Sequence, residues 1–99
     1  MTPEVKVKRK VVSLLKEMGA YNFFPVMSGY GRSGIPDIVG CYKGRFFAVE
    51  CKAGKGKTTA LQDKNIAQII ACGGLAMVVN EDNIEDVRLL MGHLSRGGK

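Results

Sequence analysis

The chain is poor in the residues that bind zinc or build disulfide frameworks. Its 99 residues include one histidine, no tryptophan and three cysteines, none of which forms a Cys-x-x-Cys pair. This scarcity argues against a Cys/His zinc site and against a disulfide-stapled secreted scaffold. We interpret Cys41 and Cys51 as small core residues within strands. Free thiols favour a reducing, cytoplasmic setting.

Long apolar runs are also missing. The longest ones fall far short of a membrane span, and Val11 to Leu15 is too short to serve as a secretory segment. We therefore expect no contact with membranes. A length of 99 residues with 45% apolar content suits one modest core, so we predict a single domain spanning residues 1–99.

Acidic residues are outnumbered by basic ones. The chain has nine Asp and Glu against fifteen Lys and Arg, and its net charge of +6 favours a polyanionic partner. Solvated surface charge is the simpler alternative, since many small soluble domains are equally basic. The basic residues cluster near the start, in a glycine-rich loop and after residue 52: Lys6, Lys8, Arg9, Lys10, Arg32, Lys55, Lys57 and Lys64.

Hydrophobic periodicity predicts an α/β fold of order αβββαβα. Both faces of the central hairpin are largely apolar, so helices should cover both sides of a mixed four-stranded sheet. We expect an antiparallel meander of three strands, then a right-handed crossover to a strand parallel to the third. The predicted helices are Val5–Met18 after a Thr2-Pro3-Glu4 start, 59–72, and one opened by a capping box at 82–85; the predicted strands are 21–27, 36–42, 45–52 and 75–80.

Two acidic residues, Asp37 and Glu50, lie at corresponding ends of the predicted hairpin. If residues 43–44 form a two-residue turn, Tyr42 pairs with Arg45 and Asp37 faces Glu50. Facing carboxylates repel each other, and a divalent cation between them removes that cost. Lys-Gly is a weak turn signal, however, and a one-residue slip would turn one carboxylate to the other face. The alternative is a turn acid at 37 and a solvated strand end at 50–52.

The order of these residues resembles the signature of the PD-(D/E)XK nucleases. The chain has Gly34-Ile35-Pro36-Asp37, then an apolar strand ending in Glu50-Cys51-Lys52, and further on Thr59-Ala60-Leu61-Gln62. The set is most similar to the VRR-NUC branch, and within it to small stand-alone phage-type members. The resemblance extends from Glu4 to about Asn80.

This resemblance implies a restriction-endonuclease-like core and a metal-dependent DNA endonuclease that uses Mg²⁺ or Mn²⁺. It implies that Asp37, Glu50 and the backbone carbonyl of Cys51 hold the metal, while Lys52 orients the attacking water or stabilises developing charge. The structural alternative is a Lys52 that is solvated or only pairs with Glu50. Small VRR-NUC proteins act on branched DNA, including four-way junctions, as homodimers. The resemblance therefore implies the same partner and assembly here, in the host-cell cytoplasm if a phage encodes the chain.

Glu4 has two interpretations. It shares a helical stripe with Val11, Leu15 and Met18, so it should point toward the body of the protein. The VRR-NUC resemblance implies that an acid from this helix joins the active site. Alternatively, Glu4 is a first-turn acid that interacts with the helix dipole.

Gln62 also has two interpretations. It completes a capping box with Thr59, and it lies on the buried stripe of its helix, where an amide needs a partner. The resemblance implies a supporting role beside Lys52.

Residues 29–34 match the dinucleotide fingerprint G-x-G-x-x-G, but they lead into a strand rather than a helix, so we reject that function. We predict a loop that offers Arg32 and Ser33 to phosphate, with the DNA path continuing along Lys55, Lys57 and Lys64. The alternative function for the whole chain is a nucleic-acid-binding module without catalysis.

Overall fold

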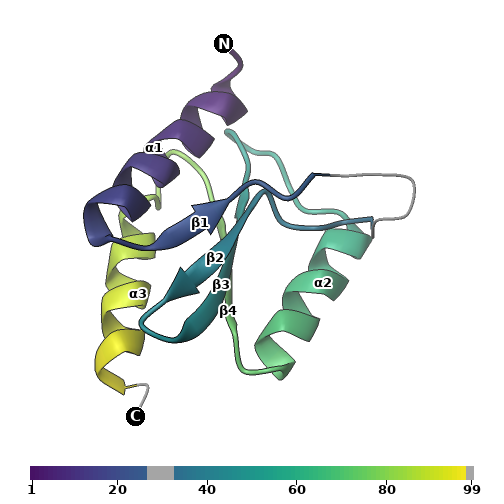
Figure 1. Cartoon of the computed structure of the whole chain (residues 1–99). Coiled ribbons are helices and arrows are strands. Elements are labelled where there is room, and N and C mark those ends of the chain that lie inside the picture. The colour runs from purple at the N-terminus through teal and green to yellow at the C-terminus, as the bar shows by residue number, and fades with distance from the viewer. Residues whose placement is uncertain (27–32, 98–99) are drawn as a thin grey trace.

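The computed structural model describes residues 1–26 and 33–97, and its elements follow the predicted order αβββαβα. Three helices surround a mixed four-stranded sheet, as in a restriction-endonuclease-like core (Figure 1). The elements are α1 (Pro3–Met18), β1 (Tyr21–Phe23), β2 (Ile38–Tyr42), β3 (Arg45–Cys51), α2 (Ala60–Ala71), β4 (Leu75–Val79) and α3 (Glu85–Gly97). Among the described segments, no helix is long and apolar enough to cross a membrane.

The sheet has the order β1-β2-β3-β4. Strands β1, β2 and β3 form the predicted antiparallel meander, and β4 runs parallel to β3. Helices α1 and α3 lie on one side of the sheet, while α2 forms the crossover on the other side (Figure 1). Helix α1 thus reaches one side of the β2–β3 hairpin and α2 reaches the other.

The hairpin has the predicted register, with Tyr42 opposite Arg45 and Ile38 opposite Val49. The turn residues Lys43 and Gly44 have φ angles of 52° and 81°. Positive φ at both turn positions is typical of a type I′ turn, whose twist matches that of the two strands. The next pair in this register, just beyond the ladder, is Asp37 and Glu50, so the turn at one end of the hairpin aligns the two acids at the other end.

The main core lies between the sheet and helices α1 and α3. Val7, Val11 and Leu15 form a buried stripe on α1, because residues four apart share a helix face. They belong to one buried cluster with residues of β2, β3, β4 and α3, namely Ile38, Phe47, Val49, Cys51, Val79, Val87 and Met91.

The α2 side of the sheet is covered less completely than the sequence predicts. Within α2, Asn65 is the one buried residue, and Phe46 on β3 is 47% exposed. Cys41 points to this side and is exposed, so its assignment to the core is wrong, whereas Cys51 is buried as expected. The apolar residues on both faces of the hairpin predict a covering layer on each side of the sheet. On this side the covering helix is α2 (Figure 1), and one helix cannot cover four strands.

The observed end of β1 and the observed start of α3 also differ from the predicted ones. Strand β1 ends at Phe23, before Pro25, which has no N–H to donate to a ladder. Helix α3 begins at Glu85 rather than after a cap at Asp82. Instead, the N–H of Asn80 donates to Oδ1 of Asn83 at 2.7 Å, so asparagine side chains organise this turn.

Candidate active site

Glu50 is a buried carboxylate at the end of β3, with 2% of the residue exposed. Its Oε2 lies 3.5 Å from Nζ of Lys52 and accepts a hydrogen bond of 3.1 Å from Nε2 of Gln62. Its Oε1 is buried without a hydrogen-bond partner among the described residues. A buried oxygen of this kind is costly, because water no longer solvates it. A ligand can satisfy this oxygen, and so can the carboxyl group of Asp37 when Glu50 carries a proton.

Asp37 lies beside Glu50, on the segment that enters β2. Its Oδ2 accepts a hydrogen bond of 2.9 Å from the N–H of Cys51, and its Oδ1 lies 3.4 Å from Nζ of Lys8. The bond to Cys51 fastens Asp37 to the last residue of β3, so the two predicted acids meet at one end of the hairpin.

The surroundings of Glu50 make its charge unfavourable. Burial and, next, the negative charge of Asp37 raise the pKa of Glu50 to about 7, against the opposing effect of Lys52. A carboxyl group that titrates near neutral pH beside a second acid is typical of functional sites. Burial also raises the pKa of the Cys51 thiol to about 12, with contributions from both carboxylates. Without a bound cation the sulfur thus stays protonated, and the backbone carbonyl remains the metal ligand that the resemblance implies at residue 51.

These residues fit a hard divalent cation. Such a cation prefers carboxylate oxygens, and Mg²⁺ usually takes one or two of them together with waters and substrate phosphates. The free Oε1 of Glu50 and the adjacent carboxylate of Asp37 match that preference. Among the side chains that the structure describes, no group of three or more His, Cys, Asp or Glu is placed to hold a metal ion.

Gln62 completes the predicted capping box and also contacts Glu50. The side-chain Oε1 of Gln62 accepts a hydrogen bond from the backbone N–H of Thr59 at 2.9 Å. The backbone N–H of Gln62 donates to Oγ1 of Thr59 at 3.2 Å, which completes the capping box. The side-chain Nε2 of Gln62 donates a hydrogen bond to Oε2 of Glu50. The start of α2 is thereby attached directly to the buried acid.

Glu4 reaches the acids through another residue. Its Oε2 lies 3.9 Å from Nζ of Lys8, which in turn pairs with Asp37. The Glu4 side chain is 44% exposed, so it lies at the rim of the site. On sequence alone, Lys8 belongs to the basic N-terminal cluster and has no predicted role in the site. Its position four residues after Glu4 is a signal for such a role, since residues four apart share a helix face.

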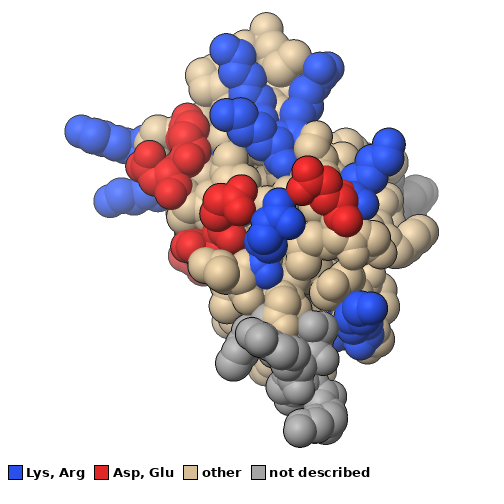
Figure 2. Space-filling model, turned by 90° about the vertical axis from the view of Figure 1, so that its left-hand side faces the viewer, with Lys and Arg blue, Asp and Glu red and all other residues tan. Residues whose placement is uncertain are grey.

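The predicted DNA-binding residues that the structure describes lie on the surface. Ser33, Lys55, Lys57 and Lys64 are exposed, and Arg32 lies outside the described residues. The loop that bears Lys55 and Lys57 is fastened by a 2.8 Å hydrogen bond from the N–H of Gly54 to Oε1 of Glu81. On the face formed by α1 and α3, basic side chains gather toward the N-terminal end of α1 (Figure 2).

A comparison with known families identifies a matching family model. Residues 4–80 match the family model described as archaeal Holliday junction resolvase (Hjc). A comparison with curated proteins gave no match. The matched region includes Glu4, both acids of the hairpin, Lys52 and Gln62. The match supports the PD-(D/E)XK superfamily, but it does not confirm the VRR-NUC branch or a phage-type member.

Proposed function

We propose that this chain, which belongs to the archaeal Holliday junction resolvase family, is a divalent-metal-dependent endonuclease that cleaves branched DNA. The family implies nuclease activity on Holliday junctions. The observation that supports metal dependence is the buried, unpartnered Oε1 of Glu50 beside the carboxylate of Asp37. A cation at this position would satisfy the free oxygen and remove the repulsion between the two acids.

In this proposal, Asp37, Glu50 and the backbone carbonyl of Cys51 hold Mg²⁺ or Mn²⁺. When bound, the cation would polarise the scissile phosphate and make a water molecule more acidic. Lys52, whose side chain is 15% exposed, points its ammonium group at the same carboxylate and can donate to a phosphate or to the attacking water. Gln62 holds the Glu50 carboxylate in place from α2.

Glu4 and Lys8 support the site from α1. Lys8 offsets the charge of Asp37 and lies 3.4 Å from its Oδ1. Glu4 pairs with Lys8 and so limits where the ammonium group can move. We assign Glu4 a positioning role, since its described ion pair is with Lys8 and not with a group that reacts.

The exposed Ser33, Lys55, Lys57 and Lys64, together with Arg32, bind the phosphate backbone in this proposal. We further propose that the chain acts as a homodimer, because a symmetric pair of subunits suits a junction with pairs of equivalent arms. The apolar side chains exposed on the α2 side, which include Phe46 and Ile70, support such an assembly.

Cleavage assays with matched substrates test this function. The purified chain is incubated with a four-way junction and with linear duplexes of the same arm sequences, in Mg²⁺, Mn²⁺ or EDTA. We expect junction cleavage in Mg²⁺ or Mn²⁺, little cleavage of the duplexes, and none in EDTA. Salt-sensitive binding without cleavage under every condition would instead identify a non-catalytic nucleic-acid-binding module.

A further inference from the structure

A cleft of about 430 Å³ opens beside Asp37, between α1, the chain that follows β1 and the chain that enters β2. This volume lies within the roughly 300–1,000 Å³ typical of small-molecule sites. The walls combine apolar and charged groups, and the lining residues are Val5, Lys8, Arg9, Phe24, Pro25, Ile35, Pro36 and Asp37. Because Asp37 is also a proposed metal ligand, whatever occupies the cleft lies next to the site of cleavage.

The apolar part of the cleft offers flat surfaces. Phe24 lines it while remaining 54% exposed, and the rings of Pro25 and Pro36 complete the wall. An aromatic ring left so exposed at the mouth of a cleft is suited to stacking with a planar ligand. The neighbouring Phe23 packs instead against Tyr21, with ring centroids 6.0 Å apart.

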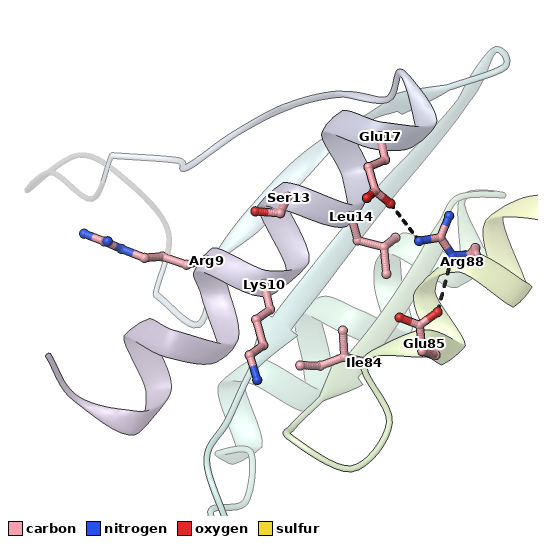
Figure 3. Close-up of a pocket in the computed structure, with 8 residues that line it drawn as sticks. All are labelled: Arg9, Lys10, Ser13, Leu14, Glu17, Ile84, Glu85 and Arg88. Atoms are coloured by element: carbon pink, nitrogen blue, oxygen red, sulfur yellow. Dashed lines mark hydrogen bonds and ion pairs between the residues drawn. The ribbon is translucent and has the colours of Figure 1, made fainter.

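The charged part of the cleft holds two basic residues, Lys8 and Arg9, beside the carboxylate of Asp37. Lys8 and Arg9 follow Val5 by three and four residues, so all three share one face of α1. Arg9 projects away from α3 (Figure 3) and makes no ion pair with any residue in the described part of the chain. A flat apolar wall next to two cations matches the two parts of a nucleotide, namely its base and its phosphate.

We propose that this cleft binds one unpaired nucleobase from the branch point of the DNA, stacked on Phe24, with the adjoining phosphate near Lys8 and Arg9. The inference rests on the proposed function and deepens it, because it names the feature of branched DNA that the protein recognises. In a linear duplex every base is paired and stacked on both sides, so extracting one costs free energy, and that cost is lower at a branch point, where continuous stacking is interrupted. Stacking on an aromatic ring tolerates any base, so the cleft selects structure rather than sequence.

Binding measurements in EDTA test the cleft independently of cleavage. Fluorescence anisotropy gives the affinities of wild-type protein, Phe24→Ala and Phe24→Tyr for a four-way junction and for a linear duplex. We expect Phe24→Ala to weaken junction binding about tenfold, in line with measured base–aromatic stacking, and to leave duplex binding unchanged. Phe24→Tyr, which keeps the ring, should restore junction binding. Phe23→Ala is the matched control and should bind both DNAs like wild type.

A second junction with abasic nucleotides at the branch point separates stacking from other effects. On this DNA, wild type and Phe24→Ala should bind equally, because the base that would stack is missing. Circular dichroism checks that each variant is folded, and Phe24→Leu replaces Phe24→Ala if the latter is not. An equal loss on junction and duplex, a loss that persists on the abasic junction, or a wild-type protein that does not bind the junction would overturn the proposal.

The two proposals fail in different ways. If the wild-type protein binds the junction through Phe24 but never cleaves it, the cleft is supported and the proposed nuclease function is wrong. If junction cleavage occurs and Phe24→Ala binds and cleaves like wild type, the function is supported and the cleft is wrong. A change in oligomeric state in Phe24→Ala, without selective loss of junction binding, would identify the cleft as a protein interface and would also overturn the proposal.

Discussion

Gln62 donates a hydrogen bond from Nε2 to Oε2 of Glu50 across 3.1 Å, while its Oε1 accepts from the N–H of Thr59. One side chain thus caps α2 and orients a buried carboxylate on β3. Because capping places the amide at the first turn of α2, the position of that helix also determines where the Glu50 carboxylate is held. The first turn of α2 is therefore linked by a hydrogen bond to a proposed metal ligand.

Substitutions at Gln62 separate its two roles. Gln62→Glu keeps the side-chain acceptor of the capping box but replaces the donor to Glu50 with a second carboxylate. We expect this variant to keep its helix content and to cleave junction DNA at least tenfold more slowly, since one hydrogen bond to a charged group contributes about 1.5–3 kcal/mol. Thr59→Ala is the control. It should lose about 1 kcal/mol of stability with near wild-type cleavage. Wild-type cleavage by Gln62→Glu would remove the contact from the mechanism.

Ionisation of Glu50 should make the metal-free protein less stable as the pH rises. The pKa of Glu50 is about 7 in the folded protein against an ordinary value of 4.5, so between these values the unfolded chain releases its proton first. Stability should therefore fall between about pH 4.5 and 7, by up to about 3 kcal/mol for this group. Urea unfolding in EDTA at several pH values measures the fall. The Glu50→Gln variant should not show this fall in stability. Identical pH profiles for the two proteins would contradict the raised pKa of Glu50.

Asp37→Asn and Lys52→Ala should each reduce junction cleavage by about a hundredfold or more, because charge stabilisation at the reacting phosphate is lost. Asparagine at position 37 can still accept the N–H of Cys51 through its amide oxygen, so Asp37→Asn should stay folded. Single-turnover cleavage and anisotropy in EDTA measure the two properties separately. Retained junction binding together with lost cleavage supports the assignment, whereas full activity in either variant would remove that residue from the mechanism.

Lys55 and Lys57 should contribute to affinity through counterion release. Each phosphate contact contributes roughly −0.9 to the slope of log affinity against log salt. If both lysines contact phosphate, the Lys55→Ala/Lys57→Ala variant should show a shallower slope by about 1.8 and similar weakening on all DNA sequences. The control, Lys16→Ala/Lys43→Asn, removes equal charge from the end of α1 and the hairpin turn, where asparagine tolerates the φ of 52°. Equal slopes in the two double variants would place the DNA elsewhere.

The hairpin register could be predicted because local chemistry decides it. Positive φ angles at both Lys43 and Gly44 make a two-residue turn, and such a turn aligns Tyr42 with Arg45. From that alignment the proximity of Asp37 and Glu50 follows. The helix starts at Thr2 and Thr59 were predictable for the same reason, since each is a local hydrogen-bonding pattern.

Features that depend on packing between distant elements could not be predicted in this way. The pairing of Lys8 with Asp37 depends on where α1 lies against the sheet, and nothing within α1 specifies that position. The exposure of Cys41 depends on how much of the sheet α2 covers. The free Oε1 of Glu50 is likewise a property of the assembled site. Sequence patterns located the acids, but only the fold shows that one oxygen lacks a partner.

The account depends most on the claim that Asp37 and Glu50 hold a divalent cation. Paramagnetic line broadening by Mn²⁺ tests this directly in isotope-labelled protein without DNA, because broadening is strongest for amides close to the ion. We predict that substoichiometric Mn²⁺ first broadens the amide signals of residues 37 and 50–52 and the side-chain amide of Gln62, and that Mg²⁺ in excess reverses the effect. Glu50→Gln should abolish it. Broadening centred elsewhere, or unchanged broadening in Glu50→Gln, would contradict the proposed metal site.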